Sequence, residues 1–224
     1  MSNERTFLHA RGRPQLARNP AARPGYGSCT GWYQSLKAGQ RFPYESLLER
    51  DAMLVLDTDV AVAKFAAQPD TFSWDDGGRQ RQYTPDLHVT MLDGRAVYRQ
   101  VKPATRFALD PTLGGRLDAI KAECAARGAT HEVWLDSDIR RQPRLANARR
   151  IRAAVAFLSD DALIATLLDV VGSLPTLGAA TDALGGKPEH FNMVLGLVAV
   201  GELEIDLDGA LESGVALRRR GCRR

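Results

Sequence analysis

Three side chains with catalytic chemistry, those of Asp86, Gln100 and Lys102, lie within residues 82–103. Apolar and polar residues alternate through this stretch, which predicts two half-buried β-strands. A carboxylate close to a lysine and an amide or carbonyl oxygen can hold a hard divalent cation, while the ammonium group orients or deprotonates a water molecule. These groups suit phosphodiester hydrolysis. The alternative is an ordinary surface ion pair between Asp86 and Lys102, since most exposed pairs contribute little.

The loop between the two strands decides whether these three side chains share a face. Leu92-Asp93-Gly94 is typical of a three-residue hairpin loop, in which a type I turn is followed by a glycine in the left-handed conformation. This loop pairs Asp86 with Gln100 across the hairpin. Because side chains alternate between faces, Lys102 then lies on the same face, whereas a slip of one residue would separate the three side chains.

A helix predicted over residues 44–56 precedes the hairpin, because apolar residues recur there at helical spacing. Glu45 and Glu49 are four residues apart and therefore project from one side of this helix. Two acids on one side can supply further cation ligands. They can equally pair with Arg50 or form a solvated face, and the pattern alone leaves both interpretations open.

The neighbouring elements indicate a mixed sheet covered by helices. Besides the hairpin, we expect strands over residues 60–65, 72–74 and 131–135. A helix that ends at Gly128 is expected before the last of these strands.

The last third of the chain changes character. An arginine-rich helical segment begins near Pro143, and three short helices are predicted over residues 160–172, 176–184 and 188–200. A strand predicted over residues 202–207 follows them, and this order is typical of a winged-helix module. Such modules bind DNA or proteins, and the acidic residues of the predicted helices favour a protein partner.

Composition indicates an ordinary globular protein with basic ends. Of 224 residues, 44% are hydrophobic and 25% are charged, and the net charge is +3. Residues 1–42 hold seven basic residues and one acid, and residues 218–224 hold five arginines and no acid. Such ends fit a protein that grips a phosphate backbone, and solubilising termini are the alternative. Residues 1–41 lack periodicity and predict an extended arm, docked on the core by Trp32 and Tyr33.

Cysteine usage and hydropathy predict a cytoplasmic protein that does not enter a membrane. Cys29, Cys124 and Cys222 are odd in number and widely spaced, so neither a disulfide framework nor a zinc site is indicated. The longest apolar run, residues 193–200, is too short to span a bilayer, and no apolar segment near the N-terminus resembles a signal peptide.

Four short motifs occur in order along the chain: Leu48-Glu49-Arg50-Asp51, Gln68-Pro69, Tyr83-Thr84-Pro85-Asp86 and Gln100-Val101-Lys102-Pro103. Together they resemble the TnsA family, the endonuclease subunit of heteromeric cut-and-paste transposases. The resemblance runs from about residue 41 to the end of the chain. A glutamine in the position that an acid usually occupies is itself typical of this family.

The resemblance implies an α/β (α+β) fold. Its core would be a restriction-endonuclease-like PD-(D/E)xK mixed sheet flanked by helices, followed by a small helical, winged-helix-like C-terminal domain. With the charge pattern, it divides the chain into a basic Arg/Pro-rich arm (1–41), a nuclease domain (42–142), a winged-helix-like domain (143–217) and a basic tail (218–224).

The resemblance also assigns roles to single residues. Glu49 and Asp86 are expected to bind Mg²⁺, for which Mn²⁺ can substitute. Gln100, in the usual position of the second acid, is expected to contribute through its backbone carbonyl and amide, and Lys102 is the expected catalytic lysine. Glu45 stays open as an alternative to Glu49 on the same helix face.

The implied activity is cleavage of double-stranded DNA at the 5′ ends of a transposon. The implied partners are a DDE-type transposase, which cuts and joins the 3′ ends, and an AAA+ ATPase recruited by the C-terminal domain. Two alternatives stay open. One is a standalone phage or host nuclease of the same fold, and the other is a catalytically silent, DNA-bound assembly subunit that recruits the ATPase.

Overall fold

The computed structural model describes residues 29–109 and 113–220, so most of the predicted arm and the end of the predicted tail lie outside the described residues. The chain divides into two compact units, Met1–Arg140 and Arg141–Arg224. This division falls close to the boundary predicted after residue 142. None of the helices in the described ranges combines the length and the apolar character needed to cross a membrane.

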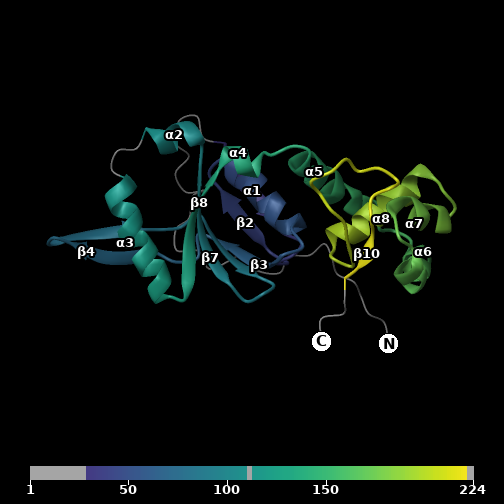
Figure 1. Cartoon of the computed structure of the whole chain (residues 1–224), viewed down its shortest axis with the longest axis horizontal. Helices are drawn as coiled ribbons and strands as arrows, with labels where there is room; N and C mark the ends of the chain where they lie inside the picture. The colour runs from purple at the N-terminus through teal and green to yellow at the C-terminus, as the bar shows by residue number, and fades with distance from the viewer. Residues whose placement is uncertain (1–28, 110–112, 221–224) are drawn as a thin grey trace. The chain divides into compact units, whose positions relative to one another are not determined.

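A four-stranded mixed sheet forms the centre of the first unit (Figure 1). Its strands, in spatial order, are β3 (Val62–Ala67), β6 (Leu87–Met91), β7 (Ala96–Lys102) and β8 (Ala129–Leu135). β6 pairs antiparallel with both β3 and β7, whereas β7 and β8 are parallel. A parallel pair needs a crossover connection, which α2 (Ala104–Ala108) and α3 (Leu113–Ala126) provide. The predicted mixed sheet is confirmed.

Helices flank this sheet, with α1 (Leu47–Thr58) and α3 on its two sides (Figure 1). On the α3 side, Ile120 and Cys124 pack with Phe72 and Tyr98 in one buried cluster. Val97 and Val101 lie on the opposite face of β7 from Tyr98, because side chains alternate between the faces of a strand, and both are also buried. Both faces of β7 therefore lie against the protein interior. The short helix α4 (Asp136–Ile139) follows β8 and contacts α1.

α1 begins three residues later than the sequence pattern predicts. Ser46 is its N-cap, and the Ser46 hydroxyl accepts a hydrogen bond from the Glu49 N–H at 3.2 Å. Tyr44 belongs to the preceding strand, and Glu45 lies before the cap. The expectation that Glu45 and Glu49 share a face of one helix is therefore wrong, because only Glu49 is helical.

The first unit also contains two hairpins outside the four-stranded sheet. β1 (Gly31–Gln34) pairs with β2 (Arg41–Tyr44), although the sequence pattern assigned residues up to 41 to an extended arm. β4 (Phe72–Asp76) pairs with β5 (Arg79–Tyr83), and Figure 1 shows this ribbon reaching away from the sheet. The sequence pattern predicts a turn over residues 76–78 and no separate strand at β5, because the alternating Arg and Gln residues of β5 carry no apolar pattern.

A buried carboxylate attaches the β1–β2 hairpin to α1. Asp57, 5% exposed, accepts hydrogen bonds from Tyr33 Oη at 2.7 Å and from Ser35 Oγ at 2.6 Å. The backbone N–H groups of Leu36 and Lys37 donate to the same carboxylate. Tyr33 thus docks its segment on the core, as predicted, whereas the Trp32 side chain is 46% exposed.

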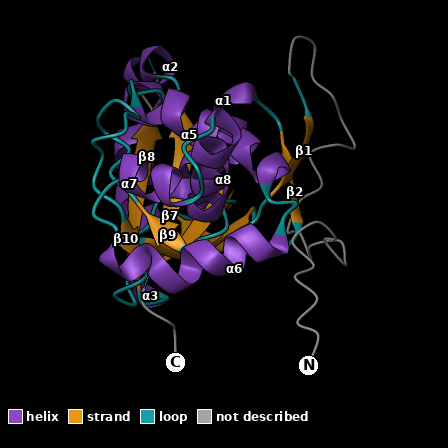
Figure 2. Ribbon diagram, turned by 90° about the vertical axis from the view of Figure 1, so that its right-hand side faces the viewer, coloured by secondary structure: helices purple, strands orange, loops and turns teal. Residues whose placement is uncertain are grey.

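The second unit is mainly helical (Figure 2). It contains α5 (Arg144–Ala154), α6 (Asp161–Val170), α7 (Leu177–Ala183) and α8 (Pro188–Ala199), the 3-10 turns η2 (Val155–Phe157) and η3 (Val171–Ser173), and an antiparallel pair of short strands, β9 (Leu203–Glu204) and β10 (Arg218–Arg219). The three helices predicted over residues 160–200 are confirmed. α8 approaches the end of α5 closely at Gly196, where a Cβ atom would lie 2.8 Å from the Ala154 carbonyl oxygen.

Candidate active site

The β6–β7 hairpin has the register that its loop predicts. Leu87 pairs with Arg99 and Thr90 with Ala96, and continuing this register by one residue places Asp86 opposite Gln100. The Met91 N–H donates to the Arg95 carbonyl at 2.8 Å, which closes a loop of three residues. Gly94 has a φ of 89° in this loop, where a side chain would be strained. The three-residue loop and the shared face are confirmed.

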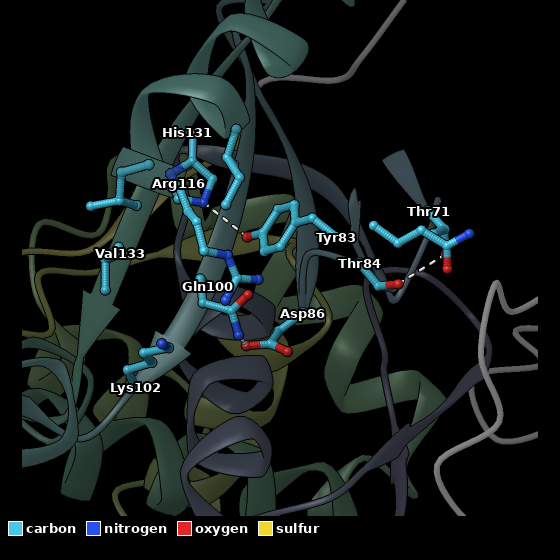
Figure 3. Close-up of a pocket in the computed structure, with 12 residues that line it drawn as sticks. Thr71, Tyr83, Thr84, Asp86, Gln100, Lys102, Arg116, His131 and Val133 are labelled. Atoms are coloured by element: carbon cyan, nitrogen blue, oxygen red, sulfur yellow. Dashed lines mark hydrogen bonds between the residues drawn. The ribbon is translucent and has the colours of Figure 1, made fainter. Parts of the chain in front are cut away.

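The Asp86 carboxylate is held by β7. Its Oδ2 atom accepts hydrogen bonds from the backbone N–H of Val101 at 2.7 Å and from the Gln100 side-chain amide at 2.5 Å (Figure 3). On the other side, the Asp86 carbonyl accepts from the backbone N–H of Gln68 at 2.9 Å. Gln68 is buried with a φ of 45°, a conformation that is sparsely populated for a residue with a side chain. Asp86 is therefore positioned from β7 on one side and from the residue after β3 on the other.

Asp86, Gln100 and Lys102 line one cleft of about 500 Å³ (Figure 3). The remaining walls come from the base of the β4–β5 hairpin, from α3 and from β8, and are formed by Thr71, Gln82, Tyr83, Thr84, Arg116, Leu117, Ile120, His131 and Val133. Three of the four predicted catalytic residues thus meet, although they are up to 16 positions apart in the sequence. Their roles stay predictions.

A half-buried tyrosine–histidine pair, missed in the sequence, forms the wall beside these residues. The Tyr83 hydroxyl and His131 Nε2 are hydrogen-bonded at 2.9 Å. Burial lowers the pKa of His131 below its ordinary value, and the charge of Lys121 lowers it further. Burial also raises the pKa of Tyr83, and the negative charge of Asp86 adds to this effect. Both side chains are therefore uncharged at neutral pH. Tyr83 ends β5 and His131 lies in β8, far along the chain, so no local pattern could reveal the pair.

Glu49 takes a different position from the one predicted. Its carboxylate accepts hydrogen bonds from the Glu45 backbone N–H at 2.9 Å and from the Ser46 hydroxyl at 3.2 Å. Together with the bond from the Glu49 N–H to Ser46, this arrangement resembles a capping box, except that the acid at the third helical position accepts from the backbone N–H just before the cap. Within the described residues, Glu49 is not among those that line the cleft. The motif Ser46-x-x-Glu49 is the sequence signal for this cap.

The donor atoms in the cleft suit a hard divalent cation. The carboxylate of Asp86 is an oxygen ligand of the kind that Mg²⁺ prefers, and the carbonyl oxygen predicted as a ligand from Gln100 is of the same kind. In residues 29–109 and 113–220, no group of three or more His, Cys, Asp or Glu side chains is placed to hold a metal ion. The predicted ligands of the cation are not a group of this kind, because they are two carboxylates and a carbonyl group. These donors fit the cation chemically, and the second carboxylate, that of Glu49, lies in the helix cap.

Comparison with known proteins adds no family to these observations. No protein-family model matches the chain, and no curated protein matches it. The cleft geometry and the resemblance of the four motifs are therefore the two observations from which a function is inferred.

Proposed function

We propose that this protein is a metal-dependent DNA endonuclease subunit of a TnsA-like transposase. One observation carries the proposal: the hairpin register brings Asp86, Gln100 and Lys102 into one cleft of a mixed sheet flanked by helices. This is the arrangement that a restriction-endonuclease-like core requires. The second unit would then be the winged-helix-like domain, with helices followed by a short pair of strands.

The residues of the cleft supply the parts of a phosphodiester hydrolysis. Asp86 and the Gln100 carbonyl would hold Mg²⁺ or Mn²⁺, which supplies Lewis-acid stabilisation of the phosphate and a more acidic water. The hydrogen bonds from Gln100 and Val101 keep the Asp86 carboxylate in a fixed orientation. The Lys102 ammonium group orients the attacking water, and its positive charge stabilises the charge that develops on the phosphate. Glu49 would complete the ligand set by exchanging its cap hydrogen bonds for the cation.

The proposed substrate is double-stranded DNA at the 5′ ends of a transposon. A DDE-type transposase would cut the 3′ ends, and the second unit would recruit an AAA+ ATPase. Acidic side chains on α6, α7 and α8 support a protein partner for this unit, because they repel a phosphate backbone. Sequence specificity would then reside in the transposase, since contacts to phosphate position a protein without reading bases.

The decisive experiment compares Asp86→Asn with Asp93→Asn in the full chain. Both variants replace one carboxylate by an amide, but Asp93 lies in the hairpin loop and pairs with Arg95. Nicking of plasmid DNA is measured with Mg²⁺ or Mn²⁺, with and without the transposase and the ATPase. We expect Asp86→Asn to lose about 100-fold or more of the rate, the loss typical of removing one electrostatic stabiliser. Asp93→Asn should keep it. An Asp86→Asn protein that nicks at the wild-type rate overturns the assignment.

The position of Glu49 favours a second candidate function, the catalytically silent assembly subunit. Because the Glu49 carboxylate forms the helix cap, the described residues of the cleft include one acidic side chain, Asp86. This candidate predicts no nicking with any metal or partner, although the protein would still stimulate strand transfer by the transposase. Nicking by the chain alone would instead indicate the standalone nuclease.

A further inference from the structure

Arg116 is an exposed, charged residue on the same stripe of α3 as the buried Ile120. It lies one helical turn before Ile120, and residues four apart share a helix face. Ile120 is 3% exposed and belongs to the buried cluster with Tyr98. Towards the start of α3, this stripe passes from the cluster to the cleft, and Arg116 is one of the residues that line it. An arginine there faces the polar space of the cleft instead of an apolar core.

Arg116 is exposed to solvent and, like Arg79 and Arg106, has no side-chain partner among the described residues. Within the described part of the chain, it makes no hydrogen bond or ion pair, while other arginines of the first unit do. Arg81, Arg95, Arg99, Arg127 and Arg140 each pair with an acid. The residues one turn after Arg116 are Ala119 and Ile120, so the helix offers it no acid at that spacing.

The charges around Arg116 suit an anion. Among its described lining residues, the cleft has two cations, Arg116 and Lys102, and one carboxylate, Asp86, while the His131–Tyr83 pair is uncharged. Figure 3 shows the guanidinium group of Arg116 directed towards Gln100. A bound divalent cation would make this space still more favourable for a phosphate.

The opposite rim of the cleft supplies neutral hydrogen-bonding groups. The hydroxyl groups of Thr71 and Thr84 are 2.9 Å apart and lie on the far side of Asp86 from Arg116 (Figure 3). Hydroxyl and amide side chains are common partners of backbone phosphates, and a guanidinium group can bind one phosphate through two hydrogen bonds. A nucleic-acid strand between these rims would have charged contacts on one side and neutral contacts on the other.

We propose that Arg116 binds a phosphodiester of the DNA backbone in the cleft and so positions the strand at Asp86 and Lys102. This inference rests on the proposed function and names a positioning residue for it. Because the contact is to phosphate, Arg116 contributes affinity for any DNA sequence.

The test measures binding of the full chain to a fluorescent DNA duplex at several salt concentrations, without divalent cations. Each phosphate neutralised by a cationic side chain contributes about 0.9 to the slope of log affinity against log salt concentration. We expect Arg116→Ala to reduce the slope by about this amount, and to bind more weakly at low salt. Arg116→Lys should keep the slope, because the point charge remains, but bind more weakly because the guanidinium fork is lost. Arg95→Ala, at the hairpin loop, is the charge-matched control and should bind like the wild type.

The outcomes separate this inference from the proposed function. Equal slopes for the wild type and Arg116→Ala, an equal reduction in Arg95→Ala, or a wild-type protein that does not bind the duplex would each overturn the inference. A reduced slope for Arg116→Ala alone supports it even if the wild type never nicks DNA with metal and partners. In that case the phosphate site stands and the endonuclease proposal fails.

Discussion

Glu49 has two candidate roles, a helix cap and a cation ligand, and two substitutions separate them. Glu49→Ala removes the acceptor of the bonds from the Glu45 N–H and the Ser46 hydroxyl. Losing a cap costs about 1 kcal/mol, and losing a negative charge at a helix N-terminus costs about 0.5 kcal/mol more. Glu49→Gln keeps an oxygen acceptor and loses only the charge, so it should cost about 0.5 kcal/mol. We therefore expect the urea midpoint of Glu49→Ala to fall by about 0.5 to 1 M, and that of Glu49→Gln by less.

Titration calorimetry with Mn²⁺ then tests the other role on the same proteins. If Glu49 leaves the cap to bind the cation, Glu49→Gln loses Mn²⁺ affinity while it keeps most of its stability. The control is Glu45→Gln, which makes the same charge change just before the cap and should bind Mn²⁺ like the wild type. A Glu49→Ala protein as stable as the wild type refutes the cap. Unchanged Mn²⁺ binding by Glu49→Gln refutes the ligand role.

Two further perturbations test the first unit. Asp57→Ala leaves the buried hydroxyl groups of Tyr33 and Ser35 without their acceptor, so we expect unfolding in urea to show a loss of about 3 kcal/mol or more, and a loss below about 1 kcal/mol would contradict this. The second perturbation is acid: the folded state lowers the pKa of His88 and His131 from 6.5, mainly through burial, so the unfolded chain binds more protons below that pH. Stability should therefore be complete above about pH 6.5 and fall as the pH drops towards the folded-state pKa values, less steeply in His131→Gln; a flat urea midpoint between about pH 7.5 and about pH 5.5 would be evidence against this linkage.

The hairpin at the centre of the site could be predicted because local chemistry specifies its register. Leu92-Asp93-Gly94 needs a left-handed residue at its third position, and only glycine adopts that conformation without strain. Alternating apolar residues in the two strands then fix which face is buried. Loop and pattern agree, so the meeting of Asp86 with Gln100 followed from sequence alone.

Other features depend on contacts that no local pattern records. The Arg and Gln residues of β5 form a strand because they pair with β4, and β1 is held by the distant carboxylate of Asp57. The Tyr83–His131 pair joins residues 48 positions apart. The start of α1 is a different case. The sequence contains the cap signal Ser46-x-x-Glu49, but the amphipathic pattern predicts a helix that begins before it, at residue 44.

The central position of β7 has a consequence for the timescale on which the cleft can change. β7 is paired on both edges, and Val97, Tyr98 and Val101 are buried on its two faces. Its amide protons should therefore exchange with solvent only when the whole unit opens, while exposed ribbons and helix ends exchange sooner. Gln100 and Lys102 thus stay in place over the long lifetime of the folded unit. If the cleft changes shape when a molecule binds, the walls formed by α3 and the β4–β5 hairpin are the parts that would move.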